Sequence, residues 1–275
     1  MRSRLMTAIV FGAALLTTVQ ADASTFATQT FRCPVWGKEF KATVQVSSSS
    51  FGNRPDGKPY WSGRAPMIEC PDNGFVFFKE NYTQAEEVVL TALVTSAEYQ
   101  ALRKSDTPEY RKVWVQSRMG GEAETIAFDH LVASWSSDGE ARRKVRYQQA
   151  FLDAAAKVPD TSKHYDILQL RTANALRELG RPDESEAVLM RLRPRVERIT
   201  DRWEREGFEK SIGGLRTLNR EGSRVSEPVI LVPDIVAARL CNETSRTFTD
   251  SEKAVCASPA IREMSERYFK MAAER

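Results

Sequence analysis

The chain contains one short pattern twice: Cys33-Pro34-Val35-Trp36-Gly37 and Cys70-Pro71-Asp72-Asn73-Gly74 both read C-P-x-x-G. In a zinc knuckle of the form C-P-x-C-G the fourth position is a second cysteine, and Trp36 and Asn73 stand there instead. A tetrahedral zinc site needs four good ligands, and only two cysteines remain. The pattern therefore predicts a ribbon that has kept the knuckles and holds no metal.

The first 23 residues have the pattern of a cleaved secretory signal. Arg2 and Arg4 precede an apolar run, Leu5 to Val19, and Ala21-Asp22-Ala23 supplies a cleavage site before Ser24. A membrane anchor and a mitochondrial presequence are the alternatives. No later segment has 18 uninterrupted apolar residues, so we expect a soluble mature protein without a transmembrane segment, either periplasmic or secreted.

Charge and length limit the classes of function. The whole chain has a formal net charge of +3. Removing the signal takes away Arg2, Arg4 and Asp22, which leaves a net charge of +2. Charges of both signs alternate along the chain, which indicates no nucleic-acid partner. The remaining chain of about 250 residues is enough for one large domain or two small ones.

The four cysteines form an even set in a chain that we expect to be exported, which favours disulfides over free thiols. Three pairings are possible, and proximity favours Cys33–Cys70 within the ribbon and Cys241–Cys256 within the C-terminal segment. By loop-closure entropy each bond contributes about 3–4 kcal/mol if it is unstrained.

Residues 24–80 read as a small β-rich module. From Phe40 to Val46 apolar and polar residues alternate, as in a half-buried strand. Residues 47–63, with their serines, glycines and the turn signal Pro55-Asp56-Gly57, read as a loop.

The apolar period changes to 3.6 after residue 80. Thr83 and Glu86 form a capping box for a helix whose predicted buried face is Ala85, Val88, Val89, Ala92 and Leu93. Residues 81–200 read as helical, with a helical hairpin formed by Tyr165 to Leu179 and Asp183 to Leu192 around Gly180. Residues 201–275 read as a C-terminal helical segment with a local disulfide, in which Gly213-Gly214 and Gly222 mark a long polar connection. The fold class is therefore α+β, mainly α.

The order of two knuckles, an aromatic strand and helical hairpins resembles an uncharacterised bacterial family with an N-terminal zinc ribbon fused to tetratricopeptide-like helices. The matching residues of the ribbon are Cys33, Pro34, Gly37, Phe40, Cys70, Pro71 and Gly74. The resemblance covers roughly residues 30–195. It implies a degenerate ribbon packed on a tetratricopeptide-like body, and it implies no activity.

Two clusters are candidate binding residues. Tyr60-Trp61 puts two large aromatic residues in a polar stretch, which is typical both of recognition surfaces and of a cover for a small core. Arg142 and Arg143 belong to a basic cluster that fits an acidic partner or anionic lipid, or simply the solvated face of an amphipathic helix.

No catalytic constellation is evident. His130 follows Asp129, but the G-x-S-x-G pattern of a hydrolase is absent, and neighbours in sequence do not define a triad. We therefore expect no cofactor and a non-enzymatic module that binds a protein or peptide, since stacked helical hairpins form concave surfaces. The alternative is a cell-envelope hydrolase acting on cell-wall material.

Overall fold

The structure is a computed structural model that describes residues 24–61, 63 and 65–273; the expected signal peptide lies outside them. It confirms the α+β, mainly α class. The strands are β1 (Thr25–Arg32), β2 (Glu39–Ser47), β3 (Ser50–Asn53) and β4 (Pro59–Trp61). The helices before residue 200 are α1 (Gln84–Thr95), α2 (Ala97–Ser105), α3 (Pro108–Arg118), α4 (Ala123–Trp135), α5 (Ala141–Ala155), α6 (Tyr165–Glu178) and α7 (Pro182–Val196). After it come α8 (Arg202–Arg220), the 3-10 turn η1 (Val229–Leu231), α9 (Asp234–Leu240), α10 (Asp250–Ala257) and α11 (Pro259–Ala273).

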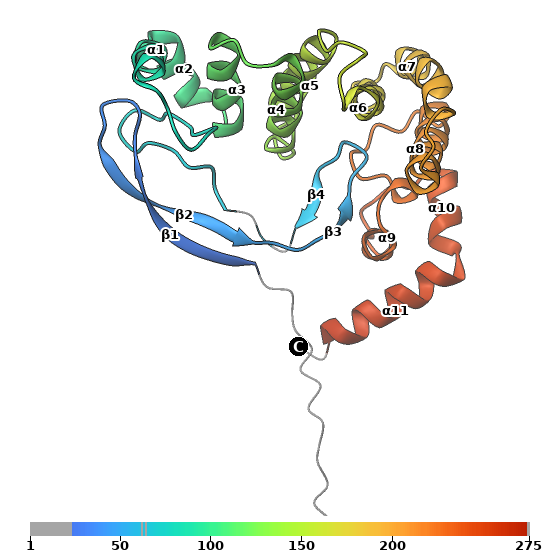
Figure 1. Cartoon of the computed structure of the whole chain (residues 1–275). Helices are drawn as coiled ribbons and strands as arrows, with labels where there is room; N and C mark the ends of the chain where they lie inside the picture. The colour runs from blue at the N-terminus through green and yellow to red at the C-terminus, as the bar shows by residue number, and fades with distance from the viewer. Residues whose placement is uncertain (1–23, 62, 64, 274–275) are drawn as a thin grey trace, which may run out of the picture.

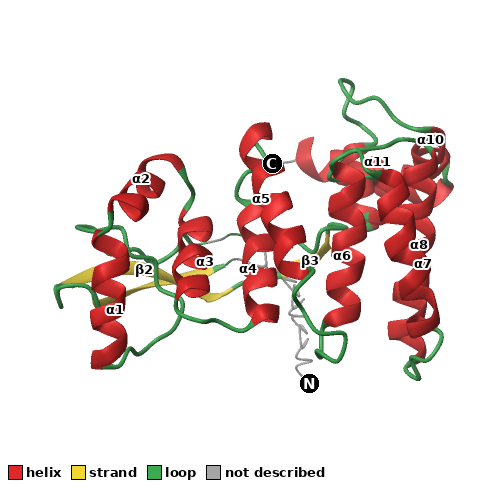
Figure 2. Cartoon of the chain, turned by 90° about the horizontal axis from the view of Figure 1, so that it is seen from above, coloured by secondary structure: helices red, strands yellow, loops and turns green. Residues whose placement is uncertain are grey.

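Helices α1 to α8 form an arch over two β-hairpins (Figure 1). Seen from above, they stand side by side, and the long β1–β2 ribbon lies under the α1–α3 end (Figure 2). One apolar cluster joins the ribbon to α1, α2 and α3, and a second fills the space between α4 and α8. A third lies under the C-terminal helices.

The β1–β2 ribbon is antiparallel, with Phe31 opposite Phe40. The predicted alternation of β2 is confirmed for Phe40, Ala42 and Val44, which are half-buried while their neighbours Lys41 and Thr43 are exposed. Phe31 and Phe40 pack with the ring of Phe77, which follows the second knuckle. The ribbon therefore takes part of its core from outside its own two strands.

The interpretation of residues 47–63 as a loop is wrong, because β3 and β4 pair there as a second antiparallel hairpin. Only the turn signal is confirmed, since Pro55-Asp56-Gly57 forms the tip and Gly57 has a φ of 88°. Two strands of four and three residues are not stable alone. Contacts with the helices and the C-terminal segment must hold them, and a local pattern does not reveal such contacts.

Helix α1 has the predicted capping box, in which Thr83 and Glu86 bond each other's backbone. The predicted buried face is wrong. Leu90 and Val94 are fully buried, whereas Val88 is 67% exposed. Both sides of this helix are apolar, and the side that carries Leu90 and Val94 faces the core around the knuckles, so tertiary packing decides between them.

Helices α6 and α7 form the predicted hairpin. Gly180 joins them with a φ of 77°, a conformation that glycine adopts without steric penalty. The buried Ser185 hydroxyl donates to the carbonyl of Ala173 at 2.8 Å, which holds the two helices close together. Leu189 and Leu192 are buried in the same crossing.

The predicted polar connection begins too early in the sequence, because α8 continues through Gly213-Gly214 to Arg220, and of the glycines that marked it only Gly222 lies in the connection. A glycine in a helix costs about 1 kcal/mol relative to alanine. Here Gly214 permits a close approach: a Cβ at this position would lie 2.3 Å from Cδ2 of Leu231. Burial of Ile212 and Leu215 on either side offsets the helix-propensity cost.

The C-terminal segment is held by the Cys241–Cys256 disulfide, which confirms that pairing. The bond joins the end of α9 to α10. Searched over the described residues, the helices include none with the length and apolar character to span a bilayer.

Candidate functional site: a pocket beside the β3–β4 hairpin

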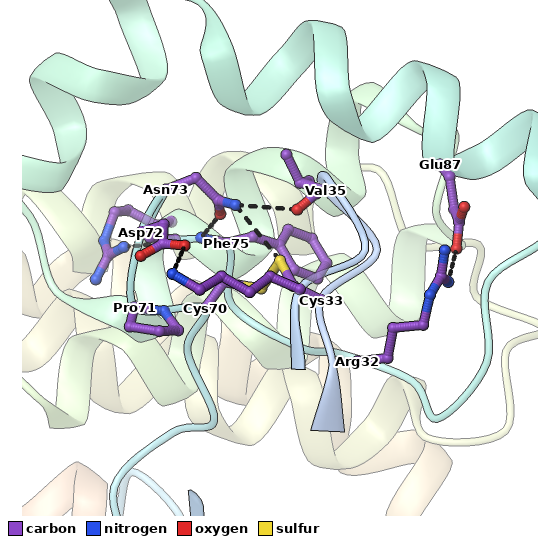
Figure 3. The surroundings of a disulfide bond; sticks show 12 residues. Arg32, Cys33, Val35, Cys70, Pro71, Asp72, Asn73, Phe75 and Glu87 are labelled. Atoms are coloured by element: carbon purple, nitrogen blue, oxygen red, sulfur yellow. Dashed lines mark hydrogen bonds and ion pairs between the residues drawn. A yellow bond between two sulfur atoms is a disulfide. The ribbon is translucent and has the colours of Figure 1, made fainter. Parts of the chain in front are cut away.

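The two knuckles are closed by the same backbone hydrogen bond. In each, the glycine N–H donates to the carbonyl of the knuckle cysteine, at 3.0 Å for Gly37 and 2.9 Å for Gly74. Cys33 and Cys70 are joined by a disulfide with Cα atoms 5.8 Å apart, which confirms the predicted bond (Figure 3). The disulfide therefore links the knuckles at the point where a zinc ion would hold them in an intact ribbon.

Asn73 and Trp36, which occupy the fourth position of the two C-P-x-x-G patterns, differ in their surroundings. The Asn73 amide donates to Sγ of Cys33 at 3.4 Å and to the carbonyl of Val35 at 3.3 Å, so it bridges the knuckles (Figure 3). Trp36 is 63% exposed and has a φ of 73°, a rare conformation for a bulky side chain. Within the described residues, no three His, Cys, Asp or Glu side chains are grouped as metal ligands.

The tip of the β3–β4 hairpin, Arg54-Pro55-Asp56-Gly57-Lys58, is closed by a backbone hydrogen bond from Arg54 to the carbonyl of Lys58 at 2.9 Å. The Asp56 carboxylate accepts from the N–H of Lys58 at 3.0 Å and pairs with the guanidinium of Arg54. Arg54 and Asp56 are both buried. The tip thus enters the interior of the molecule with its charges already paired.

The hairpin tip lies on the inner side of the arch, next to α4, α6 and α9 (Figure 1). Arg171 of α6 donates to the carbonyl of Pro55 at 2.5 Å, and Lys58 donates to the carbonyl of Trp135 at 3.3 Å. A Cβ on Gly57 would lie 3.0 Å from Nε of Arg171, so the backbone itself packs against the helix. The arch therefore holds this segment by contacts to its main chain as well as to its side chains.

Asp138, in the turn between α4 and α5, anchors the hairpin to the arch. Its carboxylate accepts from Arg54 at 2.7 Å, from Lys58 at 2.6 Å and from Lys144 of α5 at 2.9 Å. Although burial alone raises its pKa, hydrogen bonds from these cations hold the pKa well below its usual range. Asp138 stays ionised and serves as an ion-pair acceptor.

A buried polar network continues from Lys144 into α6. Lys144 lies 3.2 Å from the carboxylate of Glu178, which also accepts from Gln148 and Asn174 at 2.9 Å each. Arg177, only 2% exposed, donates to the carbonyls of residues 223 and 225 and to the side chain of Asn174. These bonds fix the extended segment that follows α8 against the arch.

A cavity of about 670 Å³, here called the hairpin pocket, opens between the hairpin, the arch and the C-terminal segment. Its walls are Phe51, Arg54, Lys58, Pro59 and Tyr60 from the hairpin, and Asp138 and Lys144 from the arch. Val225, Ser226, Glu227, Arg239 and Arg246 close it on the C-terminal side. The volume falls in the range of small-ligand and peptide side-chain sites.

The aromatic wall of the pocket is a stacked pair. The rings of Phe51 and Tyr60 lie 5.8 Å apart at an interplanar angle of 16°, and Phe51 is 52% exposed. The Tyr60 phenol oxygen is buried and lies near the carboxylate of Glu227. Burial, together with the nearby carboxylate of Glu227, raises the pKa of Tyr60. The phenol therefore stays protonated and keeps a hydrogen to donate.

The predicted binding residues are not brought together. Tyr60 lines the pocket, and the backbone of Trp61 ends β4, while the Trp61 side chain lies outside the described residues. Arg142 is exposed and Arg143 half-buried on the first turn of α5. The basic cluster is not one surface patch, because Lys144 points into the pocket network and Arg146 pairs with Asp106.

Sequence reasoning missed most of the pocket, including Phe51, Arg54, Asp138, Lys144 and Arg246. The available signals were the charged residues on both sides of Pro55-Asp56-Gly57 and the second turn signal, Asp138-Gly139. Each looks like an ordinary exposed turn. Arg54 and Asp138 are 84 positions apart in the sequence, and only the three-dimensional structure shows that they pair.

A second cavity, of about 580 Å³, lies between α3, α4 and α5 and contains Tyr110, Trp114 and His130. Both aromatic rings are already covered, since Tyr147 stacks on Tyr110 at 4.3 Å and Arg118 lies 3.6 Å from the Trp114 ring centre. Burial lowers the pKa of His130 to about 4, and its Nδ1 has no hydrogen-bond partner among the described residues. His130 is therefore a half-buried neutral imidazole whose Nδ1 is not oriented by any carboxylate among the described residues.

The chain matches no protein-family model, and no characterised protein or solved structure is significantly similar to it. The resemblance to zinc-ribbon proteins with tetratricopeptide-like helices stays a prediction.

Proposed function

We propose that this chain is an exported, non-enzymatic protein that binds a peptide segment of a partner protein in the hairpin pocket. One observation carries the proposal: the inner side of the arch already holds a peptide segment of this chain, by a main-chain carbonyl of Pro55 and by paired charges. Beside that segment is an unfilled cavity with an exposed aromatic wall. Exposed aromatic rings next to polar groups are typical of recognition surfaces.

Export is part of the proposal. Two disulfides support it, because such bonds persist in oxidising compartments. The sequence pattern of residues 1–23 supports it independently.

The cell-wall hydrolase has less support. A general acid needs a raised pKa, whereas the cations around Asp138 lower its pKa. A catalytic histidine needs an orienting partner, and none of the described residues hydrogen-bonds Nδ1 of His130. We therefore favour binding over hydrolysis.

Selection from a random peptide library displayed on phage, with the oxidised mature protein as target, tests the proposal. We expect enriched peptides whose affinity falls at least tenfold with Phe51→Ala, because that substitution removes the open aromatic wall. Trp203→Ala is the matched control, since Trp203 is 78% exposed on α8 and does not line the hairpin pocket. Absence of any enriched peptide, or equal losses in both variants, would refute the proposal.

A further inference from the structure

Strand β1 has a backbone edge that no other strand covers in the described part of the chain. β1 pairs with β2 and with no other described strand. Apart from the ladder of these two strands, no described residue forms a backbone-to-backbone hydrogen bond with Phe26, Thr28 or Thr30. In Figure 1 the N-terminal half of β1 lies below β2, on the side of the ribbon away from the arch. One edge of β1 is therefore open to another chain.

The ladder shows which backbone groups reach this edge. The N–H of Cys33 donates to the carbonyl of Lys38 at 2.9 Å, so the backbone of Cys33 points toward the second strand. Backbone groups point alternately to the two sides of an antiparallel strand, and the register continues without a shift as far as Phe26. The N–H and C=O groups of Phe26, Thr28 and Thr30 therefore point away from β2, to the open edge.

The open edge lacks the features that normally keep the edges of sheets apart. Charged side chains, prolines and bulges usually protect an edge strand. Residues 25–31, TFATQTF, contain no charge and no proline, and the bulge of β1 lies at its first residue. Uncharged segments of this length that are rich in strand-forming residues pair readily with strands of other chains. On β2, in contrast, Glu39 and Lys41 are charged and exposed.

The side chains that accompany these edge groups lie on the solvated face of the ribbon. Phe31 belongs to the opposite face, which packs with Phe77. Because successive side chains of a strand alternate, Phe26 points to the solvated face, and it is 48% exposed. Gly63 lies over this face, where its carbonyl accepts from the Gln45 amide at 2.8 Å. Gly63 forms no backbone-to-backbone hydrogen bond with β1, so the edge stays open.

We propose that two copies of the chain pair β1 with β1 in antiparallel orientation, so that their ribbons join into one sheet in the order β2–β1–β1–β2. The register that uses all the open groups places Thr28 on the two-fold axis, opposite Thr28 of the second copy. Phe26 then lies opposite Thr30 of the second copy. Each of these opposed pairs exchanges two backbone hydrogen bonds, as in any antiparallel ladder. The interface is the same patch on both copies.

A second copy fits this edge better than an unrelated peptide does. The open groups occupy alternate residues that are symmetric about Thr28, so a second β1 presents the matching donors and acceptors. Two uncharged segments meet without the repulsion of like charges across the strands. Both strands are already extended against β2, so pairing costs less conformational entropy than the ordering of a flexible peptide. None of residues 25–31 lines the hairpin pocket, so the proposal does not depend on the proposed function.

Sedimentation equilibrium of the oxidised mature protein over a concentration series measures this association. We expect twice the mass of one chain, with dissociation on dilution. Thr28→Lys places two ammonium groups opposite each other at the two-fold axis and should raise the dissociation constant of the dimer at least about tenfold. Thr43→Lys is the matched control, because Thr43 is the exposed residue opposite Thr28 in the ribbon but lies on β2. Equal circular dichroism of the two variants checks that both are folded.

Residue-resolved amide hydrogen exchange locates the interface. The amides of Phe26, Thr28 and Thr30 should be protected in the dimer and should exchange rapidly in Thr28→Lys. Those of Ala27 and Gln29, which point toward β2, should stay protected in both.

Three results would overturn the proposal. The first is a monomer at every concentration. The second is a dimer whose amides at Phe26, Thr28 and Thr30 exchange rapidly, because another surface then forms it. The third is an equal dissociation constant for Thr28→Lys and Thr43→Lys.

Discussion

Replacing Asp138 by asparagine tests whether the ion pairs of this carboxylate hold the hairpin in the arch. Asp138→Asn keeps the shape of the side chain and removes its charge. Arg54, Lys58 and Lys144 then lose a carboxylate partner that they share. Because Arg54 is only 6% exposed, its charge cannot turn to solvent without moving the hairpin.

The magnitude follows from burial. Removing one partner of a fully buried ion pair costs about 3–5 kcal/mol, and an exposed pair contributes about 0–1 kcal/mol. The Asp138 side chain is 30% exposed, so we expect a loss of about 2–4 kcal/mol in the free energy of unfolding. Glu206→Gln, which removes the partner of the exposed Arg202, is the control and should cost less than about 0.5 kcal/mol.

Urea denaturation of the oxidised protein, followed by circular dichroism, measures both variants. The pH dependence gives a second readout. Since the folded-state pKa of Asp138 is lowered from 3.8, its stabilisation is complete above about pH 5 and is lost as the pH falls through the folded-state pKa. Asp138→Asn should therefore flatten the acid limb of the stability curve. Equal stability of the two variants, or an unchanged acid limb, would refute the role assigned to Asp138.

Three further predictions concern the disulfide, the knuckles and His130. Replacing both cysteines of the Cys33–Cys70 bond by serine should lower the free energy of unfolding by about 4 kcal/mol, because the bond closes a loop of 37 positions in the unfolded chain. Urea titration measures this loss, and a change below about 1 kcal/mol would contradict the prediction. Trp36→Cys combined with Asn73→Cys should bind one zinc ion per chain under reducing conditions, measured by atomic emission, because both knuckles are closed by the same backbone hydrogen bond and Cys33 and Cys70 already meet. No zinc would show that the knuckles do not converge on one centre. An NMR titration should give His130 a pKa near 4, whereas a midpoint near 6.5 would mean that the imidazole is solvated.

Local patterns alone determined several features of this protein. An even cysteine count and short separations predicted both disulfides, and a 3.6-residue period with Gly180 predicted the α6–α7 hairpin. Such features depend on residues close together in the chain. Their geometry follows from backbone conformation and apolar spacing.

The tertiary structure alone decided the rest. Helix α1 buries Leu90 in place of Val88 because the core around the knuckles lies on that side, and α8 continues through Gly214 because Leu231 packs there. The C-P-x-x-G knuckles showed how the ribbon is held, but the pocket depends on Arg54 meeting Asp138 from 84 positions away. A charge in a turn is normally solvated, and only the arch that closes over the hairpin makes this one part of a site.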